Sequence, residues 1–276
     1  FSNQALNTLA NYGVRSLLSS QDNLRMDYKS SPVSANAPLI HTISAVTIET
    51  HSDIWITDPP YADAVNYHEL TEFFLAWYEK HIPKLFPEWY ADSKRALAIT
   101  GRDESFRHSM VEAYRNLAEH MPADGMQVVM FTHQDAAVWA DLTLILWAAG
   151  LKVSSAWTIA TETSSALKEG NYVQGTVLLI LRKQESDKTG FLSEVYPQIE
   201  DEVRRQIDSM HILDDKEEPN FADTDYQLAA YAAALRVLTQ YQNIQDIDVE
   251  QELARPREKN AEPTEIEKII YEAVRV

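Results

Sequence analysis

The feature that most constrains the fold is an alternation of short apolar runs with longer segments of helical periodicity. Four runs have the length and composition of β-strands, at residues 53–57, 126–132, 151–160 and 174–182. Strands that alternate with helices predict an α/β fold with a mostly parallel sheet covered on both faces. The last two runs follow each other without an intervening helix. That order predicts one antiparallel strand at or near the end of the sheet.

Seven segments show helical spacing of apolar residues, at 3–20, 66–81, 104–121, 135–149, 197–210, 223–240 and 264–275. We expect Pro197 in the first turn of its helix, where its missing N–H costs no hydrogen bond. In the helix 66–81, the spacing of Phe73, Phe74, Trp77 and Tyr78 favours a place in the core over a platform that stacks bases. The chain is therefore expected to comprise an N-terminal helix and loop (1–38), a sheet-containing part (39–183) and an all-α extension (184–276).

The chain is strongly acidic, with a net charge of −18 from 24 Lys and Arg against 42 Asp and Glu. Half of that charge lies beyond residue 200, where 9 basic residues face 18 acidic ones. The acidity speaks against simple coating of nucleic acid, because neutralising phosphates requires a Lys/Arg surface. Arg102 and Arg107 either meet DNA phosphate or balance the adjacent Asp103 and Glu104.

Cysteine is absent, which excludes disulfides, thiolate metal sites and a cysteine nucleophile. No apolar run approaches the length of a membrane span, and no signal peptide opens the chain, so we expect a cytoplasmic protein. The histidines show no metal-ligand spacing with carboxylates, and no metal site is expected.

The most informative segment is the end of the first strand, Asp58-Pro59-Pro60-Tyr61. In an open α/β sheet, ligands bind beyond the carboxyl ends of the strands. Two prolines stop the strand and preset the carbonyl directions, because proline fixes φ and removes the backbone donor. One carboxylate, preset carbonyls and an aromatic ring together suit an exocyclic amino group on a base. The alternative is a simple turn after a strand.

A strand that ends in Asp58-Pro59-Pro60-Tyr61 resembles the catalytic signature of S-adenosylmethionine-dependent amino-methyltransferases, which methylate adenine N6 or cytosine N4 in DNA. The chain is most similar to the bacterial adenine-specific methylases associated with anti-phage defence. The resemblance covers residues 50–183. It includes Thr57 to Tyr61, Asn66-Tyr67, Glu69-Leu70, Phe73-Phe74, Trp77, Asp124-Gly125, Phe131-Thr132-His133, Trp139, Ala149-Gly150-Leu151, Trp157, Ile159 and Thr161-Glu162.

The resemblance implies roles for individual residues of a Rossmann-like sheet. Asp58 and the Pro59 carbonyl would accept hydrogen bonds from the target amino group, with Pro60 holding the loop. Tyr61 would stack on the flipped-out base. Further substrate contacts are expected from Asn66, Tyr67, His133, Thr161 and Glu162. For His133 and Glu162, an ordinary solvated loop side chain is the alternative.

One departure concerns S-adenosylmethionine itself. The family's cofactor loop is rich in Phe and Gly, whereas the only glycine here before residue 100 is Gly13, and no Gly-x-Gly occurs. The sequence does not identify the cofactor-binding residues; Asp58 and Pro59 are candidates alongside residues upstream of Phe1. Either the cofactor half precedes Phe1 in a longer protein, or the chain does not bind the cofactor tightly. We expect the first, because the chain starts with Phe.

The resemblance thus predicts a DNA adenine-N6 methyltransferase acting in phage defence or restriction-modification, with direct methyl transfer and no covalent intermediate. Its partners would be DNA and other defence-system proteins. A non-catalytic, methyltransferase-like subunit that recognises DNA or scaffolds a defence complex is the first alternative. A cytosine-N4 or RNA amino-methyltransferase is the second.

Overall fold

The computed structural model describes residues 41–60, 67–87, 93, 95–101, 103–160, 175–214, 221–256 and 262–276. The chain divides into two units, 1–41 and 42–276, and every helix and strand that the structure describes belongs to the second. The predicted helix 3–20 therefore lies outside the described residues. In the described part of the chain, no helix is both long enough and apolar enough to cross a membrane.

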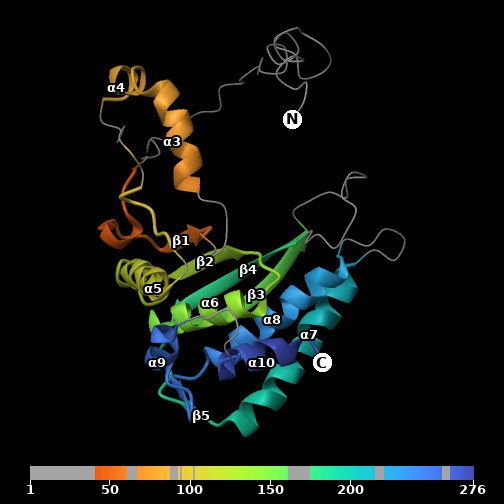
Figure 1. Cartoon of the computed structure of the whole chain (residues 1–276). Coiled ribbons are helices and arrows are strands. Elements are labelled where there is room, and N and C mark those ends of the chain that lie inside the picture. Colours follow the sequence, from red (N-terminus) through yellow and green to blue (C-terminus); the bar gives the residue numbers. More distant parts are fainter. Residues whose placement is uncertain are drawn as a thin grey trace, which may run out of the picture. The chain divides into compact units, whose positions relative to one another are not determined.

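A four-stranded mixed sheet forms the centre of this unit (Figure 1). Its strands are β1 (Ile54–Thr57), β2 (Met126–Phe131), β3 (Leu151–Ala160) and β4 (Gly175–Lys183), in the spatial order β1-β2-β4-β3. β1 pairs parallel with β2, and β4 pairs antiparallel with both β2 and β3. Three strands thus point the same way. The α/β class, the four strands and an antiparallel strand next to the end of the sheet are confirmed.

The helices that share the core with the sheet pack on one of its faces. α5 (Glu104–Glu119), α6 (Ala136–Ala148) and α8 (Asp223–Leu238) lie below it in Figure 1, with α9 (Val249–Ala254) and α10 (Glu265–Ala273) packed against α6. The side chains that point to these helices are fully buried, among them Val129, Leu179 and Leu181. One hydrophobic core therefore joins the sheet to helices of the segment 184–276.

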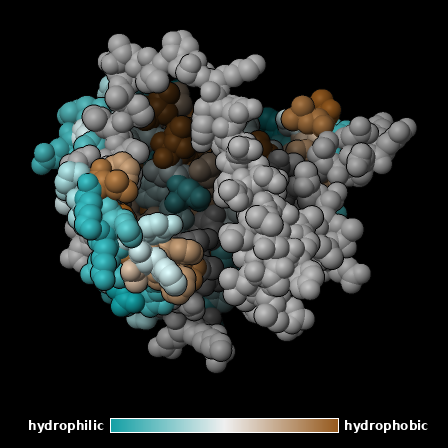
Figure 2. Space-filling model, turned by 90° about the horizontal axis from the view of Figure 1, so that it is seen from above, coloured by the Kyte–Doolittle hydropathy of each residue, from teal (hydrophilic) through white to brown (hydrophobic). Residues whose placement is uncertain are grey.

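Among the described residues, no helix of the core packs over the opposite face of the sheet, which we call the open face. Alternate residues of the same strands point to it, and Ile56 and Trp157 leave 68% and 59% of their surface exposed. Figure 2 looks onto this side of the molecule and shows strongly hydrophobic side chains at the surface. The prediction of a sheet covered on both faces is therefore wrong for the described residues. Hydropathy alone predicted burial, but burial also needs a partner element.

Helix α3 (Tyr67–Tyr78) and the short α4 (Ile82–Leu85) follow β1 without joining the core. The predicted helix is confirmed, but the prediction that its aromatic side chains lie in the core is wrong. Phe73, Phe74, Trp77 and Tyr78 are all exposed. Helical spacing identified the stripe correctly, yet no described element packs over it.

Helix α7 (Leu192–Leu213) begins five residues before the predicted start. Pro197 therefore lies inside the helix, and the expectation of a first-turn proline is wrong. The earlier start buries Val195, which packs with Ile199 in the core. That apolar packing compensates for the backbone hydrogen bond that proline cannot donate. Sequence periodicity also did not reveal the small elements η1 (Ala45–Thr47), β5 (Thr189–Gly190) and β6 (Asn243–Ile244).

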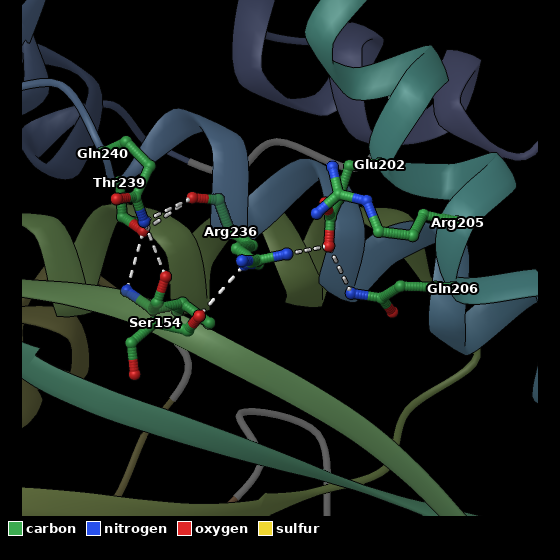
Figure 3. Close-up of polar contacts among 8 residues, drawn as sticks. Ser154, Glu202, Arg205, Gln206, Arg236, Thr239 and Gln240 are labelled. Carbon is green, nitrogen blue, oxygen red and sulfur yellow. Dashed lines mark hydrogen bonds and ion pairs between the residues drawn. The ribbon is translucent and has the colours of Figure 1, made fainter. Parts of the chain in front are cut away.

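A polar network ties α8 to an irregularity in β3 (Figure 3). The register of β3 shifts between Val153 and Ser155, which leaves Ser154 as an extra residue. Val153 donates its N–H to Thr239 Oγ1 at 2.9 Å and accepts from Gln240 Nε2 at 2.7 Å. Arg236 Nε donates to the Ser154 carbonyl at 3.0 Å. Side chains of α8 and its C-terminal turn thus satisfy backbone groups at the bulge.

The same network reaches α7 through Glu202, a carboxylate that is almost fully buried. Glu202 binds Arg236 of α8 and accepts from Arg205 at 2.7 Å and Gln206 at 3.1 Å. A buried carboxylate is tolerated when such donors surround it. α7 is thereby joined to β3 by polar contacts as well as by packing.

Candidate functional site

The parallel strands bring three chain segments to one edge of the sheet. Thr57 is opposite Val129, and Phe131 is opposite Val177 at the start of β4. Asp58 follows β1, and Thr132-His133 follows β2, so both turns leave the sheet at this carboxyl edge. In an α/β sheet this edge is the usual place for a ligand.

The Asp58-Pro59-Pro60 turn rests on the helices below the sheet. Pro59 and Pro60 line a small apolar hollow whose other walls come from α5, β2 and α6, namely Phe106, Met110, Phe131, Val138, Asp141, Leu142 and Ile145. The residue before the turn, Thr57, has its Oγ1 3.4 Å from the hydroxyl of the buried Tyr114. The turn is thus held on its apolar side, and the carboxylate of Asp58 is exposed.

Two hydrogen bonds hold His133 in the turn after β2. Trp139 Nε1 donates to the His133 carbonyl at 2.7 Å, and the Asp135 N–H donates to His133 Nδ1 at 3.0 Å. Asp135 also caps α6 by accepting from the Ala137 N–H. Because Nδ1 accepts a hydrogen bond, the proton of the neutral ring belongs on Nε2. His133 is half-buried and constrained by this turn.

The start of β4 is held by a residue that sequence reasoning missed. Asp225, fully buried in the first turn of α8, accepts from the N–H of Gly175 at 2.9 Å and from that of Ala222 at 2.8 Å. Thr132 Oγ1 donates to the Gly175 carbonyl at 3.2 Å. A Cβ at Gly175 would lie 3.0 Å from both Asp225 Oδ1 and the Ile159 carbonyl. Acidic residues early in α8 signalled a helix start, but nothing local linked Asp225 to Gly175.

The structure brings some of the predicted site residues together and does not reach others. Asp58, Pro59, Pro60 and His133 lie at the carboxyl edge. Tyr67 is the first residue of α3. Tyr61, Asn66, Thr161 and Glu162 lie outside the described residues.

Arg107 is not available to DNA phosphate. Only 1% of its surface is exposed, and it donates to the carbonyls of Leu253 at 2.8 Å and Arg255 at 2.9 Å. Its Nη1 also lies 3.9 Å from Asp141 Oδ2. Arg107 therefore joins α5 to α6 and to the end of α9, and its candidate role in phosphate binding is wrong. Arg102, the other candidate, lies outside the described residues.

The glycines of the described region do not form a cradle for S-adenosylmethionine. Gly125, Gly175 and Gly190 are packed against the protein itself, and a Cβ at Gly190 would lie 2.8 Å from Tyr241. Gly101 and Gly150 have positive φ and terminate or turn the chain. The described residues therefore do not fit the cofactor on their own. Within the same residues, no group of three or more His, Asp or Glu side chains is arranged to hold a metal ion.

No family model, curated protein or solved structure matches the chain.

Proposed function

We propose that this chain is part of a DNA amino-methyltransferase that transfers a methyl group from S-adenosylmethionine to N6 of adenine. The observation that carries the proposal is the Asp58-Pro59-Pro60 turn at the carboxyl edge, with its prolines packed and its carboxylate exposed. The antiparallel β4 next to the end of the sheet supports the Rossmann-like methyltransferase sheet that the sequence predicts. A cytoplasmic role in phage defence or restriction-modification belongs to the same proposal.

The residues of this turn would act on the amino group of a base taken out of the duplex. Asp58 would accept one of its two hydrogen bonds, and the Pro59 carbonyl would accept the other. An amine conjugated to a base is a weak nucleophile, and acceptors on its hydrogens raise the electron density on nitrogen. The rigid turn would hold both acceptors in place before the base arrives, so that catalysis is mainly positioning.

S-adenosylmethionine supplies the methyl group in this proposal, and we place its cradle outside the described residues. DNA phosphates would be contacted by residues other than Arg107, because Arg107 is buried.

The test is the methylation state of DNA in a host that lacks adenine methylation. The chain is expressed within its complete coding region, and nucleosides are quantified by mass spectrometry. Asp58→Ala should lower N6-methyladenine at least ~100-fold, since it removes an acceptor that acts at the reacting atom. Asp53→Ala is the matched control, because Asp53 is an exposed carboxylate just before β1, at the other end of the same strand. Wild-type methylation by the Asp58 variant would refute the proposal.

A second candidate is a non-catalytic subunit that recognises DNA or scaffolds a defence complex. The lack of a cofactor cradle among the described glycines favours it. If that reading is right, the complete coding region also leaves DNA unmethylated. Titration calorimetry of residues 1–276 with S-adenosylmethionine locates the cradle. Micromolar affinity would place it in the segments of this chain outside the described residues and would count against the non-catalytic candidate.

A further inference from the structure

One surface of the described unit has no role in the proposed chemistry. Five large apolar side chains lie along one side of α3, and we call them the α3 stripe: Leu70, Phe73, Phe74, Trp77 and Tyr78. Each leaves more than half of its surface exposed, and Trp77 leaves 71%. Exposed apolar patches of this kind mark sites of interaction, and Trp, Tyr and Phe dominate the affinity of protein interfaces.

Two charged residues of opposite sign, Glu69 and Lys80, lie near the two ends of the stripe. Glu69 lies near the start of α3 and Lys80 in the turn that continues it, and both are exposed. Eleven residues separate them. An α-helix has 3.6 residues per turn, so eleven residues make about three turns. A hydrogen-bonded turn from Tyr78 to His81 follows α3 directly, and we therefore infer that Lys80 lies on the same edge of the stripe as Glu69. One edge of the stripe is thus negative at its beginning and positive at its end.

This order is complementary to itself in an antiparallel arrangement. When two identical helices pack antiparallel, the same edge of each helix lies next to its counterpart. Residue i of one helix then lies opposite residue j of the other, and the sum i + j is the same for every opposed pair. The register that sets Glu69 opposite the second copy's Lys80 places the two-fold axis between Phe74 and Leu75. That point is also the middle of the α3 stripe. The same register therefore pairs both charges and centres the two stripes on each other along the helix axis.

We propose that two copies of this chain associate through antiparallel packing of their α3 stripes. The two-fold axis passes beside Phe74, and Glu69 of each copy pairs with Lys80 of the other. The acidic side chains of α3 and of the turn after it, Glu69, Glu72 and Glu79, disfavour nucleic acid as the occupant of the stripe. The association is independent of the proposed methyl transfer.

Disulfide cross-linking tests the position of the two-fold axis. The chain contains no cysteine, so an introduced thiol can react only with its counterpart in the second copy. In Phe74→Cys, the new thiol lies beside the axis, so mild oxidation should link two copies through a disulfide in most of the protein. Ala76→Cys is the matched control, because Ala76 is exposed two residues along the helix and faces away from the stripe. Equal cross-linking of the two variants, or none in Phe74→Cys, would overturn the proposal.

Charge exchange tests the register by sedimentation equilibrium of the full chain. Glu69→Lys should weaken the dimer about tenfold, because it replaces two attractive pairs by two repulsive ones. The double variant Glu69→Lys, Lys80→Glu should restore wild-type affinity. Trp77→Glu should abolish the dimer. A chain that stays monomeric at all concentrations, or a dimer lost in Ile56→Glu on the open sheet face but retained in Trp77→Glu, would refute the inference.

Discussion

The two faces of the sheet carry similar apolar side chains, but one face is buried and the other is exposed. On the covered face, Val129, Leu179 and Leu181 are fully buried beneath the helices. On the open face, Ile54, Ile56 and Trp157 are at least half exposed. Both faces are apolar, so amino-acid composition does not determine which face is buried. The difference lies in the partner elements, because the described helices of the core pack on one side only.

This contrast shows which apolar residues stabilise the unit. Burial of apolar surface contributes about 25 cal/mol for each Å² removed from water, and a side chain that remains in solvent contributes little. The covered face should therefore supply most of the stability. The open face should be nearly neutral in the isolated chain, and it would become stabilising only when something binds to it.

The largest effect is expected from neighbouring leucines of β4. Leu179→Ala should lower the free energy of unfolding by about 2–5 kcal/mol, because it leaves a cavity in a fully buried position. Leu178→Ala is the same substitution one residue away, on the half-buried opposite face. It should cost less than about half as much, because its surroundings can relax into solvent. Urea unfolding followed by circular dichroism measures both, and equal losses would remove the distinction between the faces.

The elements of the fold could be predicted because periodicity is local. Apolar runs located β1 to β4, and helical spacing located α3, α5, α6, α8 and α10. The position of Asp58 at the carboxyl edge followed from the strand that precedes it. Periodicity cannot say what packs over a face, and for that reason Trp77 and Ile56 were expected in the interior.

Long-range polar contacts were also beyond the sequence. Arg107 looked like a surface cation beside Glu104, yet it is buried and binds carbonyls about 150 residues away, as at Leu253 (|i−j| = 146). Asp225 is bonded to Gly175, 50 residues earlier. Each pairing depends on how separate helices and strands dock, and no local pattern encodes it. The bulge at Ser154 belongs to the same class, since its partner Arg236 lies on α8.

An intermediate effect is expected on the helix side of the sheet, at the two arginines that bind Glu202. Arg236→Met should cost about 1–3 kcal/mol, because the Ser154 carbonyl and Glu202 both lose a donor at partly or fully buried positions. Arg205→Met removes the other arginine, whose side chain is 64% exposed, and should cost less than about 1 kcal/mol. Thermal unfolding of the two variants gives the comparison. A larger loss of stability in Arg205→Met would mean that the exposed Arg205–Glu202 pair matters more than the contacts of Arg236 with Glu202 and β3.

The smallest effect is expected at Asp103, which caps α5 on the covered side. Its carboxylate accepts from the Ser105 hydroxyl at 2.8 Å and from the N–H groups of Ser105 and Phe106. The hydrogen bond from Ser105 and that from Phe106 hold the pKa of Asp103 below its ordinary value of 3.8. A lowered pKa in the folded state stabilises the fold at pH values above 3.8, and this stabilisation is lost as the pH falls through the folded-state pKa.

Asp103→Ala should therefore destabilise the chain slightly at neutral pH, and the difference from wild type should shrink as the pH falls below 3.8. Denaturant unfolding at a series of pH values measures that difference. Glu112→Ala, an exposed acidic residue in the middle of the same helix, is the control and should show no such trend. Titration of the Asp103 carboxyl carbon by NMR gives the pKa directly. A midpoint at or above 3.8 would show that the cap does not hold the first turn of α5, and with it Phe106, over the covered face.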